Sequence, residues 1–518
     1  TWRELLENTP NVDFWQDSVN SLIVSRGTVC GVVTGMGLEI QAKSVIITSG
    51  TFLNGVIHVG EKQFGGGRMG EKGATGITEQ LVELGFEADR LKTGTPPRVD
   101  GRSLDYSKME IQEGDEEIVG FSYLPIQKIT AAQQRCCWIT HTSQEVHDIL
   151  KTGFDKSPMY QGRIQGTGPR YCPSIEDKIN RFAERERHQL FVEPEGWNTH
   201  EIYVNGFSTS LPEEVQFDAL RRVPGFEQCK FFRPGYAIEY DYFPPTQLKF
   251  TLETKLIENL YFAGQINGTT GYEEAACQGL MAGINAHRKT HELEPVVLKR
   301  SDAYIGVLID DLINKGTDEP YRMFTSRAEY RTILRQDNAD LRLTELGHRI
   351  GLAKEDRMRL VEEKINQINH TKAVLKSFPV EPKEVDALLI AKGSSPLNEK
   401  TRAEKVLLRP NIGLKELINQ IPNLAKEVNC TDELVLEQVE IQTKYEVYIE
   451  KEKELVLKMA ALEDLIIPDS FNYEKLSALS AEAKQKFIKI KPRTLGQASR
   501  ISGVNPSDVQ ILMVYMGR

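Results

Sequence analysis

The chain has 518 residues, of which 40% are apolar and 27% are charged, and its formal net charge is −10. This composition is typical of folded globular proteins, so an intrinsically disordered chain is excluded, and the length predicts roughly two to four domains. The longest apolar runs fall far short of the roughly 20 residues of a transmembrane helix, so no membrane association is expected.

Cysteine usage and the first residues give two further expectations. The seven cysteines lack paired spacing, which argues against a disulfide framework and indicates a reducing, cytoplasmic location. No Cys-x-x-Cys pattern occurs, so no metal site is expected. The chain opens at Thr1-Trp2-Arg3 without methionine or an apolar leader, and this predicts that upstream sequence is missing.

The first half of the chain reads as mixed α/β structure. Residues 1–60 predict a β-meander that leads into a buried strand at 44–49, which ends in glycine. A short helix is expected at 77–84. Residues 100–247 mix short strands and loops with one helix at 175–190, and this block is predicted to be an insertion.

The α/β pattern then resumes and gives way to helices. A buried strand is predicted at 259–264, followed by a helix of small residues at about 273–287. From about residue 303 the pattern is helical and charged, with long periodic stretches such as 437–459 and no convincing strand. The segment 494–514 predicts two helices joined by a turn.

A glycine pattern of the dinucleotide-binding type occurs at Gly65, Gly67 and Gly70, with Glu87 and Asp89 further on. That fingerprint requires a tight strand-turn-helix unit. The preceding residues are polar and further glycines follow, so the pattern is interpreted as a glycine-rich loop.

The segment from Phe262 to Cys277 carries a stronger signal. A buried strand is followed by a loop of small and hydroxyl residues that opens a helix, where backbone N–H groups suit an anion or a polarised carbonyl. Together with the glycine-ended strand at 44–49, it fits a two-dinucleotide-type flavoprotein sheet closing over a flavin. A tightly packed helix without a ligand remains the alternative.

Cys172 precedes the predicted helix at 175–190, with Arg170 and Lys178 nearby. A helix start and adjacent cations favour a thiolate, whereas Glu176 and Asp177 oppose it. The residue is therefore either a reactive thiol or a small buried apolar side chain.

Two basic clusters stand out from the acidic background. In 321–335, Arg327, Arg331 and Arg335 are predicted to share a helix face, and 484–500 holds six basic residues and no acidic one. Such clusters with aromatic neighbours suggest binding to a phosphate backbone, although a solvated face is the simpler alternative.

Several long motifs together resemble one family. They lie at 50–55, 66–68, 90–98, 157–162, 168–178, 233–241, 262–276, 320–331 and 496–503. These motifs resemble the tRNA uridine 5-carboxymethylaminomethyl modification enzymes of the MnmG/GidA family, and the resemblance covers essentially the whole chain.

The resemblance implies an FAD-dependent enzyme that acts on tRNA with the GTPase MnmE as its partner in a heterotetramer built on a homodimer. It implies that a carboxymethylaminomethyl or aminomethyl group is added to C5 of the wobble uridine. Methylenetetrahydrofolate would supply the one-carbon unit, glycine or ammonia the amine, and NADH the electrons. The family pattern opens with a glycine-rich FAD fingerprint and a second functional cysteine that precede the first residue of this chain, so the chain alone is expected to bind FAD poorly.

The resemblance also implies roles for individual residues. The catalytic residue is Cys172, and the flavin contacts are Val19, Ala74, Gly264 and Gln265. The nicotinamide segment comprises Gly168, Pro169, Arg170, Tyr171, Cys172, Pro173, Ser174, Lys178 and Phe182. The two basic clusters, rather than the resemblance, supply the expected tRNA contacts, which are Arg322, Arg327, Arg331, Arg335, Lys489, Lys491 and Arg493.

The expected architecture is an α/β, two-dinucleotide-type FAD-binding domain, incomplete at its N-terminus, with an inserted α+β domain and an all-helical C-terminal region. The expected boundaries are 1–95 and 248–300 for the FAD domain, 96–247 for the inserted NAD and substrate domain, 301–455 for the helical domain, and 456–518 for a C-terminal subdomain that meets tRNA and MnmE. A folate- and FAD-dependent tRNA uracil C5 methyltransferase and a non-catalytic RNA-binding protein are the alternatives. The long helical region argues against the methyltransferase.

Overall fold

The computed structural model describes residues 2–116, 118, 120–124, 129–170, 173–463, 465–468, 470–476 and 478–516. The predicted site residues Tyr171 and Cys172 therefore lie outside the described residues. The chain divides into two compact units. The first comprises 1–120, 127–297 and 308–323, and the second comprises 121–126, 298–307 and 324–518.

The first unit contains the predicted meander. After a short helix α1 (Trp2–Glu7), strands β1 (Val19–Ser25), β2 (Thr28–Thr34) and β3 (Glu39–Gln41) form an antiparallel sheet in the order β1-β2-β3. Glycine is required at Gly31, because a Cβ atom there would lie 2.2 Å from the carbonyl oxygen of Ile40 on β3. The meander leads the chain into the apolar strand β4 (Val45–Ile47), as predicted.

Strand β4 pairs with a strand from far along the chain. Strand β15 (Leu260–Phe262) lies parallel to β4, with Leu260 beside Val45 and Phe262 beside Ile47. All of β15 is buried, as expected for a short parallel strand covered on both faces. Helix α6 (Tyr272–Thr290) follows and contacts both strands. The strand predicted at 259–264 and the helix predicted at 273–287 are confirmed.

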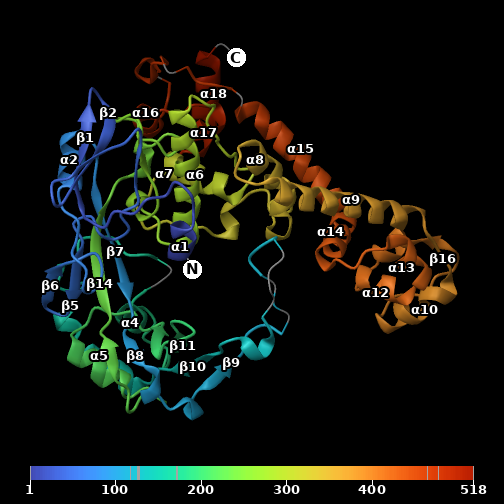
Figure 1. Cartoon of the computed structure of the whole chain (residues 1–518), viewed down its shortest axis with the longest axis horizontal. Helices are drawn as coiled ribbons and strands as arrows, with labels where there is room; N and C mark the ends of the chain where they lie inside the picture. The colour runs from blue at the N-terminus through green and yellow to red at the C-terminus, as the bar shows by residue number, and fades with distance from the viewer. Residues whose placement is uncertain are drawn as a thin grey trace. The chain divides into compact units, whose positions relative to one another are not determined.

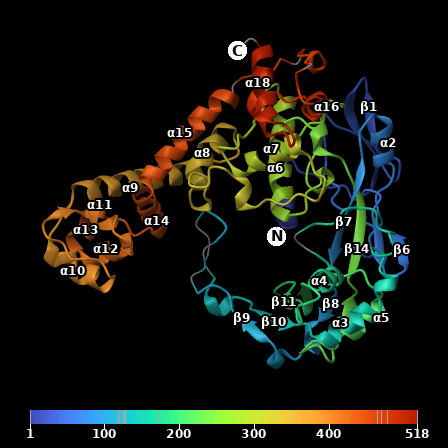
Figure 2. The same cartoon turned by 180° about the vertical axis from the view of Figure 1, so that it is seen from behind.

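A second sheet connects this region to the inserted block. Its strand order is β6-β5-β14-β7, and its members are β5 (Val56–Val59), β6 (Lys62–Gly65), β7 (Asp89–Thr95) and β14 (Tyr236–Tyr242). The helix predicted at 77–84 is α2 (Ile77–Glu83). The glycine-rich stretch at 65–70 follows β6 and opens no helix, so it is not a dinucleotide fingerprint. Both views show β7 and β14 side by side, leading toward the inserted block (Figures 1 and 2).

The inserted block is an α+β fold around a six-stranded antiparallel sheet with the order β13-β8-β12-β11-β10-β9. The strands are β8 (Arg98–Asp100), β9 (Glu110–Gln112), β10 (Cys137–His141), β11 (Gln189–Pro194), β12 (Glu201–Asn205) and β13 (Phe231–Arg233). The helices are α3 (Gln144–Lys151), α4 (Ile175–Arg181) and α5 (Glu213–Leu220). Leu150, Ile179, Val192 and Leu220 belong to its buried core.

One helix prediction in this block is too long. The sequence predicts a helix over 175–190, whereas α4 ends at Arg181 and Gln189 begins β11. Residues 181–187 are exposed, so burial does not stabilise a longer helix. Leu190 instead pairs with Thr140 of β10, and strand pairing outweighs the local helical periodicity.

Two buried histidines make this block sensitive to acid. His147 and His188 are 3% and 7% exposed, and their ring centres lie 5.3 Å apart. Burial lowers the pKa of each histidine below its ordinary value of 6.5. Below about pH 6.5 the unfolded chain takes up protons at both rings more readily than the folded chain does. The free energy of unfolding should therefore decrease as the pH falls below about 6.5, and this decrease should be complete below the folded-state pKa values.

Urea titrations at about pH 7.5 and about pH 5.5 should therefore show a lower midpoint at the acidic pH, although the raised pKa of Glu176 acts in the opposite sense and reduces the difference. The variant His188→Gln should show a smaller difference between the two midpoints. Equal midpoints for the original chain at both pH values would contradict the expectation.

The second unit is predominantly helical. Residues 304–307 of α7 (Tyr304–Lys315) belong to it, and the rest of that helix belongs to the first unit. The other helices are α8 (Ala339–Arg349), α9 (Glu355–Ser377), α10 (Pro382–Ala391), α11 (Ala403–Leu407), α12 (Leu414–Gln420), α13 (Pro422–Val428), α14 (Glu433–Lys444), α15 (Glu446–Glu463), α16 (Ala481–Ile490), α17 (Leu495–Arg500) and α18 (Pro506–Tyr515). One apolar core joins α9 to α14, and another joins α16, α17 and α18. Figure 2 shows α10, α12 and α13 gathered at one end of the long helix α9.

Details of this unit differ from the sequence pattern. The stretch 437–459 is interrupted at Tyr445, where α14 ends and α15 follows. Two short strands, β16 (Pro379–Val380) and β17 (Thr401–Arg402), pair where no strand is predicted. The two helices predicted in 494–514 are confirmed as α17 and α18.

Across the described part of the chain, no helix combines the length and apolarity needed to cross a membrane. Within the same residues, no group of three or more His, Cys, Asp or Glu side chains is placed to hold a metal ion.

Candidate functional site

Two glycine-ended strands bring candidate flavin residues to one sheet edge. Since β4 and β15 are parallel, Gly50 and Gly264 both follow the carboxyl ends of their strands. Gly50 has a φ of 58° and Gly264 a φ of 87°, which are conformations that favour glycine. A Cβ atom on Gly50 would lie 3.6 Å from Oε1 of Gln265. The structure therefore places the predicted flavin residues Gly264 and Gln265 beside the end of β4.

Buried side-chain amides hold the turn that follows Gly264. The Oε1 atom of Gln278 accepts hydrogen bonds from the backbone N–H of Gly264 at 3.1 Å and from the side chain of Asn267 at 2.8 Å. The Nε2 atom of Gln278 donates to the hydroxyl of Thr269 at 3.0 Å. Because Gln278 belongs to α6, this helix fixes the conformation of the loop that precedes it.

Unpaired polar atoms at this edge test whether a flavin fits. The hydroxyls of Ser49 and Tyr240 and the Oδ1 atom of Asn267 are buried without a hydrogen-bond partner among the described residues. Burial raises the pKa of Tyr240, and the neighbouring Gln265 side chain opposes that rise. Buried polar groups without partners are uncommon and costly. A flavin ring carries donors and acceptors of the kind that these atoms lack, so the chemistry of the residues at this edge is compatible with a flavin.

The other two candidate flavin residues lie near this edge through backbone contacts. The N–H of Ala74 donates to the carbonyl of Phe52, just after the glycine that follows β4, at 2.8 Å. Val19 begins β1, and the next residue, Asn20, approaches Gly76 so closely that a Cβ atom on the glycine would lie 2.5 Å from the Asn20 carbonyl oxygen. Ala74 is thus adjacent to the segment that follows β4, and Val19 is one contact further away.

A buried carboxylate anchors the loop that precedes the predicted nicotinamide segment. Glu239 on β14 is 5% exposed, and its Oε1 atom accepts hydrogen bonds from the N–H groups of Gln165 at 2.8 Å and Gly166 at 2.6 Å. Its Oε2 atom lies 3.6 Å from Nε2 of His58 and 3.6 Å from the guanidinium of Arg90. Burial alone would raise the pKa of Glu239, but His58, the two N–H groups and Arg90 outweigh it and lower the pKa to about 2. The ionised carboxylate ties the loop to the β5-β14-β7 part of the sheet.

The sequence pattern alone does not predict this anchor. Arg90 and Glu239 lie in motifs that match the family, and Arg90 also pairs with Asp241 at 2.5 Å. One signal could identify such an anchor from the sequence. Glu239 and Asp241 occupy alternate positions of β14, a strand whose other residues are apolar or aromatic, and buried charges require partners.

Part of the predicted nicotinamide segment lines a small cavity. Gly168, Pro169, Arg170 and Pro173 line a space of about 180 Å³, together with Lys92 of β7. The structure therefore brings these four predicted residues together.

The remaining described residues of the segment have structural contacts outside that cavity. The hydroxyl of Ser174 accepts the N–H of Asp177 at 3.2 Å and caps α4. Lys178 donates to the carbonyl of Gly206 at 3.0 Å, and Phe182 is exposed after the end of α4. The structure does not bring these three residues to the cavity.

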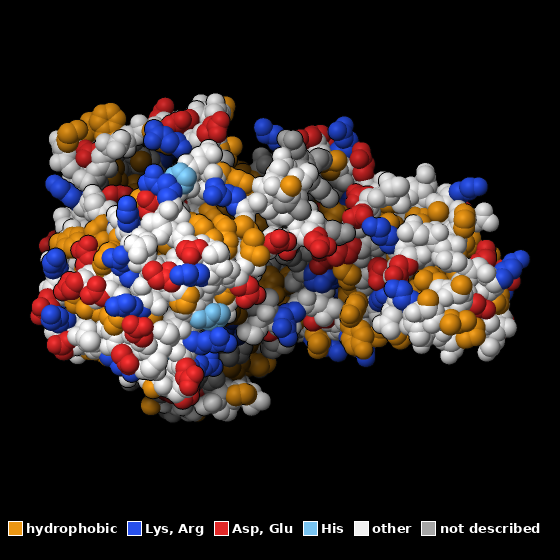
Figure 3. Space-filling model, turned by 90° about the horizontal axis from the view of Figure 1, so that it is seen from below, with side chains coloured by type: hydrophobic (Ala, Val, Ile, Leu, Met, Phe, Trp, Pro, Cys, Tyr) orange, Lys and Arg blue, Asp and Glu red, His pale blue; other side chains and the backbone are white. Residues whose placement is uncertain are grey.

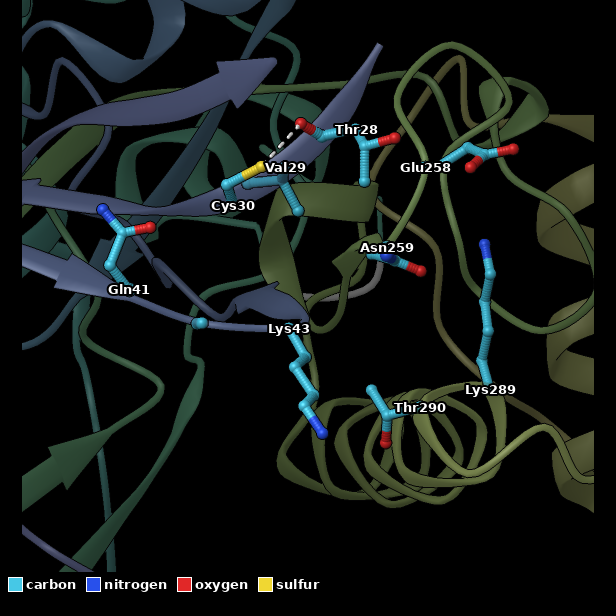
Figure 4. A pocket seen from close by; sticks show the side chains of 10 residues that line it. Thr28, Val29, Cys30, Gln41, Lys43, Glu258, Asn259, Lys289 and Thr290 are labelled. Carbon is cyan, nitrogen blue, oxygen red and sulfur yellow. Dashed lines mark hydrogen bonds between the residues drawn. The ribbon is translucent and has the colours of Figure 1, made fainter. Parts of the chain in front are cut away.

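A larger cavity of about 670 Å³ lies at the amino ends of β4 and β15 (Figure 4). Lys43 precedes β4, Asn259 precedes β15 and Lys289 lies near the end of α6, and all three line it. Figure 4 shows the side chains of Lys43 and Lys289 extending in different directions. None of the predicted site residues lines this cavity, so it is separate from the candidate site.

The first predicted basic cluster is not a helix face, so that prediction is wrong. Within 321–335 the chain forms only a short 3-10 helix at Thr325–Arg327 and irregular turns. Tertiary hydrogen bonds replace those of a helix: Arg300, for example, donates to the carbonyl of Arg327 at 3.1 Å.

The arginines of this segment also differ in their surroundings. In the first unit, Arg322 pairs with Glu274 at 3.1 Å. In the second unit, Arg335 is held by Asp337 at 3.0 Å, whereas Arg331 is exposed. These arginines therefore differ in partners and exposure, and they are not presented by one helix.

The second basic cluster forms an exposed group at the end of α16. Lys489, Lys491 and Arg493 are exposed there, and Lys491 ends the helix with a φ of 52°. We call these three residues the α16 cluster. On the face of the molecule in Figure 3, by contrast, basic and acidic side chains are interspersed.

Models of known protein families match three consecutive parts of the chain. The family model described as "Glucose inhibited division protein A" matches residues 1–294. The models described as the MnmG/GidA C-terminal helical domain and C-terminal helical bundle match 355–453 and 456–518.

Similar proteins extend over the whole chain. Two relatives named tRNA uridine 5-carboxymethylaminomethyl modification enzyme MnmG are 61% identical (Cytophaga hutchinsonii) and 63% identical (Flavobacterium johnsoniae), each covering 100% of this chain and 83% of the relative. The form II crystal structure of Aquifex aeolicus GidA matches with a TM-score of 0.87 and 43% identity, covering 100% of this chain and 82% of that chain. The chain belongs to the MnmG/GidA family.

Proposed function

We propose that the chain is a flavin-dependent enzyme that adds a carboxymethylaminomethyl or aminomethyl group to C5 of the wobble uridine of certain tRNAs. The sheet edge at the ends of β4 and β15 carries the proposal, because Gly50, Gly264 and Gln265 converge there beside unpaired buried polar atoms. In doubly wound folds, cofactors bind at the carboxyl ends of parallel strands. The name of the relatives supports the substrate and the product.

The flavin would be held at this edge by Val19, Ala74, Gly264 and Gln265. A bound flavin supplies reversible hydride and electron transfer, while the protein supplies binding and orientation. Gln278 keeps the Gly264 turn in one conformation, so the turn already has its shape before a ligand arrives.

The chemistry at uracil calls for a protein nucleophile, and we assign this role to Cys172. C5 is a weak nucleophile until C6 has been attacked, so the thiolate adds to C6 and the electron pair of the C5–C6 double bond becomes available at C5. C5 then forms a bond to the one-carbon electrophile. Loss of the C5 proton to a base and expulsion of the thiolate from C6 restore the double bond. Glu239 anchors the loop before this residue and Ser174 caps the helix after it.

The remaining partners and boundaries are part of the same proposal. NADH reduces the flavin, methylenetetrahydrofolate supplies the carbon, glycine or ammonia supplies the amine, and MnmE acts with a homodimer of the chain in the cytoplasm. The FAD domain comprises 1–95 and 248–300, the inserted domain 96–247, the helical domain 301–455, and the subdomain that meets tRNA and MnmE 456–518.

Analysis of the nucleosides of treated tRNA tests the proposal. Unmodified tRNA is incubated with the chain, NADH, methylenetetrahydrofolate, glycine, MnmE, GTP and a saturating excess of FAD, because the chain alone is expected to bind FAD poorly. The tRNA is then digested and examined by mass spectrometry. We expect 5-carboxymethylaminomethyluridine with glycine and 5-aminomethyluridine with ammonia. The complete Cytophaga hutchinsonii relative serves as the positive control, and the affinity of each protein for FAD is measured in parallel by equilibrium titration. Formation of 5-methyluridine would indicate the methyltransferase instead, and tRNA binding without flavin or product would indicate a binding protein.

A further inference from the structure

Lys92 is a buried lysine that has no carboxylate partner among the residues that the structure describes. This residue of β7 is 7% exposed, and its ammonium donates a hydrogen bond to the sulfur of Met159 at 3.0 Å. A thioether is a weak acceptor. Among the described residues, no carboxylate oxygen lies within salt-bridge distance of the Lys92 ammonium. Since a buried charge with so weak a partner is costly, its retention requires a reason.

Glu176 is a buried acid that forms no ion pair with Lys92 among the described residues. Glu176 is fully buried, and its Oε1 atom accepts the N–H and the hydroxyl of Ser210 at 3.1 Å and 3.3 Å, while its Oε2 atom has no partner among the described residues. Burial raises the pKa of Glu176, although Ser210 and the charge of Lys92 oppose the rise. Glu176 is therefore held by Ser210 rather than by Lys92.

Lys92 lines the small cavity of about 180 Å³, and most of the charged residues that line this cavity are basic. Arg170 and Arg181 line the same space, and Asp177 is the acidic residue of the lining. Arg170 is 3.9 Å from Glu319 and largely exposed, so it stays available to a ligand. The cavity is smaller than the roughly 300–1,000 Å³ of sites for drug-sized ligands, so it suits a single small group.

Glycine keeps the backbone close to the lysine. A Cβ atom on Gly168 would lie 3.3 Å from Cδ and 3.8 Å from Nζ of Lys92, so the loop backbone covers the side chain directly. The N–H of Lys92 donates to the carbonyl of Thr167 at 3.0 Å, which fixes the loop to β7. The ammonium is thus held at one wall of the cavity before a ligand arrives.

We propose that Lys92, with Arg170 and Arg181, forms a phosphate subsite in this cavity and binds a phosphate group of the reduced nicotinamide dinucleotide. A compact ammonium beside two guanidinium groups matches the charge and the several acceptor oxygens of phosphate better than a single carboxylate. The assignment to the dinucleotide rests on the proposed function, whereas the phosphate subsite itself does not.

Calorimetric titrations of the full chain test the proposal. The ligands are inorganic phosphate, NADH and reduced nicotinamide riboside, which lacks phosphate, and the variants are Lys92→Met, Arg181→Gln and the control Lys151→Met. Lys151 is an exposed residue of α3 that pairs with Asp148. We expect Lys92→Met to weaken phosphate and NADH binding roughly 10- to 100-fold and to leave the riboside unchanged, because one charged hydrogen bond is removed. Arg181→Gln, on an exposed side chain, should show a smaller loss for the same two ligands, and Lys151→Met should show none.

The outcomes separate the subsite from the proposed function. Unchanged binding of phosphate and NADH in both cavity variants would overturn the subsite, and Arg181→Gln decides the matter if Lys92→Met does not fold by circular dichroism. Equal losses for NADH and the riboside in Lys92→Met would overturn the assignment to phosphate. Phosphate binding that depends on Lys92, without binding of either nicotinamide compound, would support the subsite and contradict the use of NADH.

Discussion

Replacing Cys172 by serine should abolish tRNA modification, with the rate reduced by at least about a thousandfold. A serine hydroxyl without an adjacent base is a far poorer nucleophile than a thiolate, so it cannot add to C6 of uracil at a comparable rate. The substitution changes one atom, and we expect the melting temperature and the tRNA affinity to remain unchanged. Single-turnover formation of the modified nucleoside, measured with saturating tRNA, isolates the chemical step.

Cys430 provides a matched control in the same chain. This half-exposed cysteine lies in the second unit, where its sulfur is 3.7 Å from Oε1 of Gln367, and it has no place in the proposed chemistry. Cys430→Ser should retain the original rate. An active Cys172→Ser variant, or an equal loss in both variants, would remove Cys172 from the nucleophile's role.

Removing the α16 cluster should weaken tRNA binding about 10- to 100-fold at low salt. Lys489, Lys491 and Arg493 are exposed together, and each cation that neutralises a phosphate releases counterions from the RNA. Replacing all three by glutamine should therefore reduce the slope of log affinity against log salt by about two to three, at roughly 0.7–0.9 for each cation removed. Fluorescence anisotropy with labelled tRNA at several salt concentrations measures both quantities.

The same helix supplies the control for this experiment. Lys484 donates to the carbonyl of Glu474 at 2.6 Å, and Lys486 pairs with Glu482 at 2.9 Å, so both charges are already engaged. Replacing these two by glutamine should change affinity and slope less than replacing the α16 cluster does. If the cluster variant keeps the original affinity and salt slope, the cluster is an ordinary solvated face.

Much of the fold follows from the sequence pattern where the pattern is local. The strand at 259–264 and the helix at 273–287 are predicted because apolar runs, small residues and glycines all favour the same elements. The prediction is wrong where long-range contacts decide. Leu190 continues a helical periodicity but pairs with β10, and the segment around Arg327 has a charged helical pattern but is held by Arg300.

In the candidate site, too, the residues set by local sequence are predictable and those set by long-range contacts are not. Gly264 and Gln265 are predictable because they follow a buried strand directly. Lys92 and Glu239 are not, because their importance depends on which loop covers β7 and β14, and a single sequence does not give that pairing. Placement of Cys172 stays a prediction, since the residue lies outside the described part of the chain.

The pairing of β7 with β14 has a consequence for how this architecture arose. The ladder runs from Asp89 beside Tyr242 to Thr95 beside Tyr236, so the chain leaves the sheet and returns to it at neighbouring positions. The whole block 96–235 is therefore, in topological terms, the loop of a β-hairpin. Lengthening a loop costs only about 0.6 kcal/mol for each doubling, and this loop has a core of its own that offsets the cost. An ancestral tight turn can thus be exchanged for a folded domain without shifting the register of the sheet, which makes this point of the fold a natural place for evolution to add or replace a substrate-handling module.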